Sequence, residues 1–213
     1  MKKTRIIPIS IFVALVLAPK LVIAVDRVSR PLAVGQNIPS ALVRTTEGSL
    51  VDIRTQVENQ HTVLLFYQGG WSPYCEIQLK DINTATEDLK SLGYQLIAIG
   101  AETPEQAKKT QDRLTLKFKI LSDASLSASQ AFGVLSPTSE SSKSPMENPG
   151  KFLPTPSAFF LNEKGKIQFR YISPNATTRL LKGSTLIVAK EFSGQKSEKG
   201  EILPVSPLSG KKP

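Results

Sequence analysis

The sequence predicts an α/β fold in which a mixed central sheet is flanked by helices on both faces. Two observations support this fold class. The expected elements follow the order β, α, β, α, β, short α, loop, β-hairpin and α along the chain. Residues 61–67 (HTVLLFY) also form a continuous apolar run, with the length and the β-branched and aromatic content of a strand buried on both faces.

The first half of the domain contains a hairpin, the buried strand and a helix. Short apolar runs between residues 38 and 53, separated by Thr46-Glu47-Gly48, predict a peripheral hairpin. A helix is expected after the buried strand, because Ser72 is a good N-cap and Pro73 suits the first helical position. One face of this helix carries Cys75, Leu79, Ile82, Thr86 and Leu89, and Gly93 is expected to end it.

The second half follows from the same patterns. The capping box Thr103-Pro104-Glu105-Gln106 predicts the start of a helix. Residues 135–150 are rich in Ser, Pro, Lys and Glu and are expected to form a surface insertion loop of unknown role. The other expected elements are strands 95–100 and 118–121, a short helix over 123–132 closed by Gly133, a hairpin of strands 157–161 and 166–172, and a helix over 184–192.

The start of the chain has the pattern of a secretory signal peptide. Residues 1–24 combine a basic start, an apolar stretch and the small-residue exit Val22-Ile23-Ala24, so we expect cleavage after Ala24 and a periplasmic or secreted protein. An uncleaved anchor is the alternative, but Lys20 leaves the apolar run short of a membrane span, and no membrane attachment is expected after cleavage. The expected organisation is a signal peptide (1–24), a leader (25–34), one domain (35–193) and a disordered tail (194–213).

Composition excludes several function classes. The formal net charge is +9, but four of the positive residues lie in the first 24 residues, which leaves 9 − 4 = +5 for the rest. The remaining basic residues are interspersed with acidic ones, so the basic stripe of a nucleic-acid-binding protein is missing. One Cys and one His cannot form an intrachain disulfide or a zinc site, and no phosphate-binding loop is present, so no metal or cofactor is expected.

The chemistry is expected in residues 67–75 (YQGGWSPYC), at the junction of the buried strand and the helix. Cys75 occupies the third helical position, where free backbone amides and the helix dipole favour a thiolate. The Ser72 hydroxyl could cap the Cys75 amide or donate to the sulfur. Alternatively, Cys75 is a small core residue. Gly69 and Gly70 favour the reactive thiol, because they let backbone or substrate approach closely and core packing gives no reason for them.

Residues 67–75 and 153–165 (LPTPSAFFLNEKG) resemble the peroxiredoxin-like branch of the AhpC/TSA family in the thioredoxin superfamily. The resemblance covers roughly residues 35–192 and implies a thioredoxin-like fold. It makes Cys75 the catalytic nucleophile and Ser72 its hydroxyl partner. Pro156 matches the cis-proline that faces the active-site turn, although it could be an ordinary proline at a strand start. The residues expected to line the site are Gly70, Trp71, Pro73, Tyr74 and Pro156.

Three positions depart from the family pattern. Gln68 stands where Pro is common, and Pro156 stands where the family has an Arg that pairs with the thiolate. Ser72 replaces a Cys present in many members of the branch, so an internal dithiol cycle is unavailable.

Three hypotheses follow for the function. The first is a one-Cys antioxidant peroxidase that reduces peroxides and is restored by an external thiol or a thioredoxin-like protein. The second is a monothiol that exchanges disulfides with partner proteins. The third is a redox-silent module that binds a partner beside Pro156. The peroxide, the reducing partner and the oligomeric state stay open.

Overall fold

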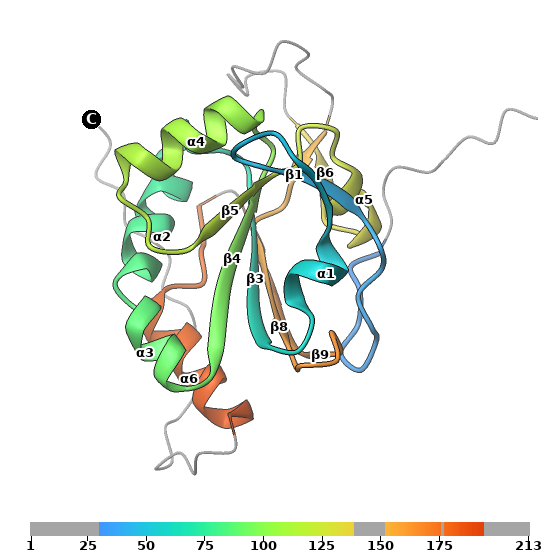
Figure 1. Ribbon diagram of the computed structural model, residues 1–213, viewed down its shortest axis with the longest axis vertical. Coiled ribbons are helices and arrows are strands. Elements are labelled where there is room, and N and C mark those ends of the chain that lie inside the picture. Colours follow the sequence, from blue (N-terminus) through green and yellow to red (C-terminus); the bar gives the residue numbers. More distant parts are fainter. Residues whose placement is uncertain (1–29, 139–151, 176, 194–213) are drawn as a thin grey trace, which may run out of the picture.

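The computed structural model describes residues 30–138, 152–175 and 177–193 (Figure 1). Its centre is a seven-stranded sheet with the strand order β2-β1-β5-β4-β3-β8-β9. Three neighbouring strands are parallel: β3 (His61–Tyr67), β4 (Tyr94–Gly100) and β5 (Lys119–Ser122). The antiparallel strands are β1 (Leu42–Thr45), β2 (Leu50–Asp52), β8 (Ser157–Leu161) and β9 (Ile167–Ile172). The predicted mixed sheet is confirmed.

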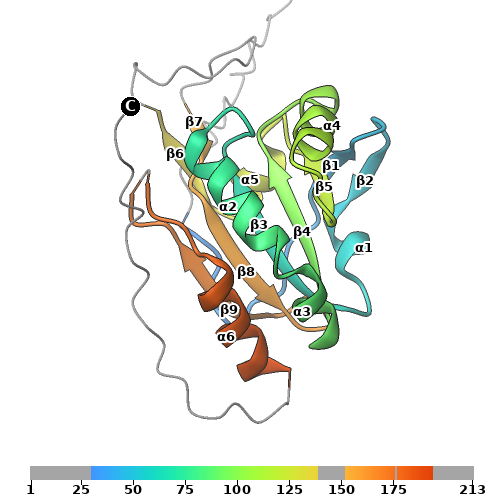
Figure 2. The same ribbon diagram turned by 90° about the vertical axis from the view of Figure 1, so that its left-hand side faces the viewer.

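Helices cover both faces of this sheet (Figures 1 and 2). One face packs against α2 (Pro73–Asn83), α3 (Thr86–Ser91), α4 (Pro104–Arg113) and α6 (Lys182–Phe192). The other face packs against α1 (Ile53–Val57) and α5 (Ser127–Ala131). Alternation along β3 builds both cores, because Val63 and Leu65 face the first set while Leu64 and Phe66 face the second.

The single helix expected after Ser72 is two helices in the structure. α2 ends at Asn83 and α3 begins at Thr86. Thr84 ends the first helix, since its amide and its hydroxyl both bond to the Asp81 carbonyl, at 3.1 and 2.7 Å. Threonine offers the backbone such alternative hydrogen bonds, so the helix stops although the apolar face continues.

The expected insertion loop begins with a strand. β6 (Leu135–Pro137) pairs with β7 (Phe152–Pro154) in a separate two-stranded sheet, so the prediction of a loop from residue 135 is wrong for its first three residues. Residues 139–150 of the expected loop, the signal peptide (1–24) and the tail (194–213) lie outside the described residues. Within the ranges that the structure describes, no helix is long and apolar enough to cross a membrane.

The end of the leader is held against the domain. Arg170 of β9 donates to the carbonyls of Pro31 and Leu32, at 2.6 and 2.5 Å. The Leu32 amide donates to the Phe132 carbonyl at 3.1 Å. Pro31 and Leu32, which fall within the expected leader, therefore bond to the domain.

Candidate active site

Cys75 lies where strand β3 is followed by helix α2. Ser72 has the extended backbone of an N-cap, Pro73 starts the helix and Cys75 is its third residue, as the sequence predicts. Its side chain is fully buried. The free amides of the first helical turn and the positive end of the helix dipole favour negative charge on this sulfur.

A buried arginine that the sequence analysis did not identify contacts the thiol. Arg179 lies between β9 and α6, and its Nη2 donates to the Cys75 Sγ over 3.6 Å. Its Nη1 donates to the Thr178 carbonyl at 2.9 Å, and its guanidinium lies 5.9 Å from the centre of the Tyr74 ring. The side chain is fully buried. The guanidinium therefore places a positive charge within hydrogen-bond distance of the sulfur.

The helix that carries the thiol also holds the segment that carries Arg179. Gln78 is 1% exposed, and its Nε2 donates to the Leu180 carbonyl at 2.9 Å. Asp81, one turn later, accepts a hydrogen bond of 2.6 Å from the Lys182 amide. These bonds fix the backbone on the C-terminal side of Arg179. The distance between guanidinium and sulfur is therefore set by α2.

Ser72 takes its expected place but makes no side-chain cap. Its carbonyl accepts the first helical bond from the Glu76 amide at 2.9 Å, while its hydroxyl does not bond to the free amides of the helix. The residue is buried, with 5% of its surface exposed. Its hydroxyl is therefore available for something other than capping.

The two glycines before the turn have packing reasons, contrary to the expectation from the sequence. A Cβ on Gly69, which has φ +154°, would lie 2.2 Å from the indole Nε1 of Trp71. A Cβ on Gly70 would lie 2.2 Å from Oγ1 of Thr110 in α4. Close packing of Trp71 and Thr110 therefore requires both glycines, and the glycines alone do not indicate a substrate.

The other expected site residues are only partly brought together. Tyr74 is beside Arg179, whereas Trp71 folds back over Gly69. Pro73 is exposed at the helix start. Pro156 is buried just before β8, which pairs with β3, so it lies level with the active-site turn. The expected cis peptide is wrong, because the described residues contain no cis peptide bond.

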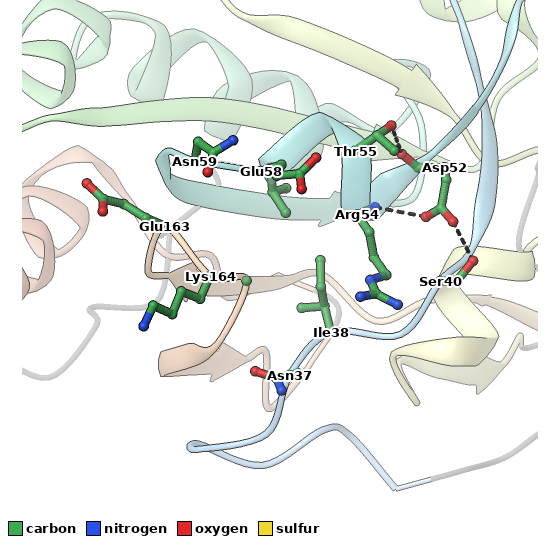
Figure 3. Close-up of a pocket in the computed structure, with 12 residues that line it drawn as sticks. Asn37, Ile38, Ser40, Asp52, Arg54, Thr55, Glu58, Asn59, Glu163 and Lys164 are labelled. Carbon is green, nitrogen blue, oxygen red and sulfur yellow. Dashed lines mark hydrogen bonds between the residues drawn. The ribbon is translucent and has the colours of Figure 1, made fainter.

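A pocket of about 680 Å³ lies at the opposite end of the sheet, between α1, the β8–β9 turn and residues 37–40. Figure 3 shows the Arg54 side chain extending from α1 toward Ile38. The Asp52 carboxylate accepts hydrogen bonds from the Ser40 hydroxyl and from the Arg54 amide. The pocket is separated from the thiol by the length of β3. The pocket and the thiol therefore lie at different ends of the sheet.

Comparisons with known proteins agree with the fold. The model of the AhpC/TSA family matches residues 34–170. The chain is 26% identical to peroxiredoxin Bcp of Escherichia coli K12 over 104 residues, which are 49% of this chain and 66% of Bcp. It is 25% identical to the thiol-disulfide oxidoreductase ResA of Halalkalibacterium halodurans over 134 residues, 62% of this chain and 65% of ResA. These matches span just under two thirds of either relative.

The reduced Prx3 of Vibrio vulnificus, solved in complex with hydrogen peroxide, has a similar fold. It superposes with a TM-score of 0.66 at 15% identity and covers 74% of this chain and 99% of its own. Arg179 lies beyond residue 170, where the family match ends. Neither the family pattern nor the local sequence therefore pointed to it, and its only signal was a basic residue directly before the apolar pair Leu180-Leu181.

Proposed function

Because the chain belongs to the AhpC/TSA family, we propose that it is a thiol peroxidase that reduces peroxides with one cysteine, Cys75. The observation that carries the proposal is the buried Arg179 guanidinium, with Nη2 3.6 Å from the Cys75 sulfur at the start of α2. Arg179 supplies a cation beside the thiol although Pro156 occupies the position of the family's arginine. The similarity to proteins named peroxiredoxin supports the same reaction class.

The first step oxidises the sulfur. The Cys75 thiolate attacks one oxygen of the peroxide, an S–O bond forms and the O–O bond breaks. The departing oxygen takes up a proton and leaves as water or an alcohol, and the sulfur becomes a sulfenic acid. Arg179 stabilises the thiolate and the negative charge that develops on the departing oxygen. The Ser72 hydroxyl, which does not cap the helix, orients the peroxide.

The second step restores the thiol with external reductant, because Cys75 is the only cysteine in the chain. A first thiol attacks the sulfenic sulfur, an S–S bond forms and water leaves. A second thiol then attacks this mixed disulfide and releases the Cys75 thiolate. The two electrons come from the two external thiols, which are those of a small thiol or of a thioredoxin-like protein.

The burial of Cys75 favours a second candidate, a redox-silent module that binds a partner beside Pro156. The thiol has no exposed surface, so a peroxide reaches it only when neighbouring side chains shift. Trp71 and Tyr74 are half-buried and lie within four residues of the thiol in sequence. In the silent module these side chains would stay closed, and the thiol would not react.

The test is to treat the folded protein with hydrogen peroxide and a sulfenic-acid trap and to measure its mass. We expect one trapped sulfenic acid per chain, absent from Cys75→Ser, and peroxide consumption when an external thiol is present. A folded wild-type chain that gains no adduct and consumes no peroxide contradicts the peroxidase and leaves the binding module.

Export is a further part of the proposal and rests on the sequence pattern of residues 1–24. The mature chain is then expected to begin at Val25 in the periplasm or in the medium. N-terminal sequencing of the exported protein tests this, and a chain that retains Met1 contradicts it.

A further inference from the structure

A buried polar cluster that the proposed reaction does not use lies behind the active-site turn. Its centre is Glu102, in the loop between β4 and α4, with only 3% of its surface exposed. Oε1 of Glu102 accepts hydrogen bonds from the Gly70 amide at 3.0 Å and from the Thr110 hydroxyl at 2.8 Å. Oε2 accepts a hydrogen bond of 2.6 Å from the Tyr67 hydroxyl. The carboxylate thus joins strand β3, the active-site turn and helix α4.

The backbone around Glu102 is shaped to permit these contacts. A Cβ on Gly100 of β4 would lie 2.4 Å from Cζ of Tyr67, so only glycine lets the phenol cross this strand to reach the carboxylate. In the same way, Gly70 has no side chain where Thr110 approaches. Two glycines in separate segments are therefore required by one cluster. The contacts of Glu102 with Tyr67 and Thr110 therefore depend on glycine at both positions.

The carbonyl of Gly70 is also bound, by the side chain of Arg113. Arg113 of α4 donates from Nη2 to the Gly70 carbonyl at 2.8 Å and from Nη1 to Oε2 of Glu76 at 2.7 Å. The Glu102 carboxylate thus accepts from the amide of Gly70, and the Arg113 guanidinium donates to its carbonyl. This fixes the turn that leads into α2, and with it the place of Cys75 on the first helical turn.

The Glu102 carboxylate and the Cys75 thiol both interact with one buried phenol, that of Tyr67. It accepts all three hydrogen bonds, as an ionised carboxylate does. Tyr67 belongs to the same buried cluster as Cys75, and its hydroxyl donates to the Glu102 carboxylate. Burial, and next the charge of Glu102, hold the pKa of Tyr67 well above its usual range, and the charge of Cys75 contributes in the same direction. The carboxylate and the thiol therefore act on the same phenol.

The other charged and titratable groups near the thiol come from α2, α4, β9 and the segment between β9 and α6. Arg179 donates to the sulfur, and Tyr74 and Glu76 belong to the thiol's own helix. Arg113 approaches from α4, and Tyr171 of β9 interacts electrostatically with Arg179. Glu76 is bound by Lys80 and Arg113, which offset its charge. Glu102 is the buried carboxylate of this group, and its charge is opposite to that of Arg179.

We propose that Glu102 is a positioning residue that fixes the active-site turn, and that its buried negative charge opposes the positive charge of Arg179 at Cys75. This inference rests on the proposed function, since it concerns how the same thiol is tuned. Such opposition is useful chemically, because a thiolate becomes a weaker nucleophile as its conjugate acid becomes stronger.

The test follows the alkylation rate of Cys75 by iodoacetamide against pH, in the full folded chain. Only one cysteine is present, so alkylation reports on this thiol alone. Glu102→Gln keeps the shape and removes the charge, and we expect the pH midpoint to fall by about 0.5 unit or more. Thr110→Val is the matched control, because it removes one hydrogen bond from the same carboxylate and leaves the charge. Its midpoint should equal that of the wild type.

A folded Glu102→Gln protein with the wild-type midpoint overturns the inference, as does an equal shift in Thr110→Val. A wild-type protein that consumes no peroxide contradicts the proposed function instead, whatever the midpoints are. If Glu102→Gln does not fold, Glu102→Asp decides. It keeps the charge but is one methylene too short to hold both Gly70 and Tyr67, so we expect the wild-type midpoint with a several-fold loss of peroxide turnover. Wild-type turnover in that variant overturns the positioning role.

Discussion

The two ends of the central sheet carry charge in different ways. At the end that holds Cys75, Arg179 and Glu102 are buried, and they bond to residues 104 and 32 positions away in sequence. At the opposite end lies the pocket of about 680 Å³, but Arg54 is exposed and the side chain of Asp52 bonds within 12 positions. Burying a charge is costly unless its partners are fixed. We therefore base the proposed active site on buried charge with distant partners and not on concavity.

The largest expected effect comes from replacing an arginine by methionine at each end of the sheet and comparing the two variants. Arg179→Met removes the cation beside the sulfur, and we expect peroxide turnover to fall about 100-fold, the usual loss when one charge-stabilising donor is removed. Arg54→Met makes the same change in the pocket and should leave turnover at the wild-type value. Steady-state peroxide consumption measures both. Equal turnover in the two variants, with both folded, would show that the Arg179 contact is structural only.

An intermediate effect is expected from the glutamines that tie distant segments together at each end. Gln78→Leu removes the bond to the Leu180 carbonyl and loosens the segment that carries Arg179. We expect turnover to fall roughly 3- to 10-fold, which corresponds to the free energy of one lost buried hydrogen bond. We also expect the pH midpoint of Cys75 alkylation to rise.

The matched control is Gln95→Leu, at the amino end of β4. Its Nε2 donates to the Gln56 carbonyl and to the Thr62 hydroxyl, both at 2.9 Å. We expect a comparable loss of thermal stability and no change in turnover or midpoint. A midpoint that moves equally in both variants would mean that Gln78 acts through general stability.

The smallest expected effect concerns two N-caps. Thr103 makes a complete capping box with Gln106, so Thr103→Ala should cost about 1 kcal/mol of stability and leave turnover unchanged. The Ser72 side chain makes no capping bond, so Ser72→Ala should cost clearly less, while turnover falls. Denaturant unfolding and peroxide consumption measure the two quantities. A Ser72→Ala variant with full turnover would remove the hydroxyl from the proposed reaction.

Local sequence predicted the elements that depend on local physics. The bounds of β3, the capping box before α4 and the hairpin of β8 and β9 all follow from short patterns, and each is confirmed. The break between α2 and α3 was missed, since the expected helix followed the apolar face and not the hydrogen bonds of Thr84. The position of Cys75 on the first helical turn was predicted, because Ser72 and Pro73 define that turn.

Tertiary partners could not be predicted in this way. Arg179 meets Cys75 only after the segment between β9 and α6 has folded back along α2, and no spacing in the sequence specifies this approach. Glu102 reads as an ordinary acidic residue before a capping box, and its burial depends on the phenol of Tyr67 crossing β4. The cis-proline expected from the resemblance was wrong.

The separation of 104 residues between the thiol and its guanidinium has a consequence for a newly made chain. During synthesis, Cys75 emerges long before Arg179, and until residue 179 has folded against α2 the thiol lacks its neighbouring guanidinium. The contact between guanidinium and sulfur is therefore among the last to form. An unfinished or unfolded chain carries an exposed thiol without this neighbour, and both the burial of Cys75 and its contact with Arg179 come only with the completed fold.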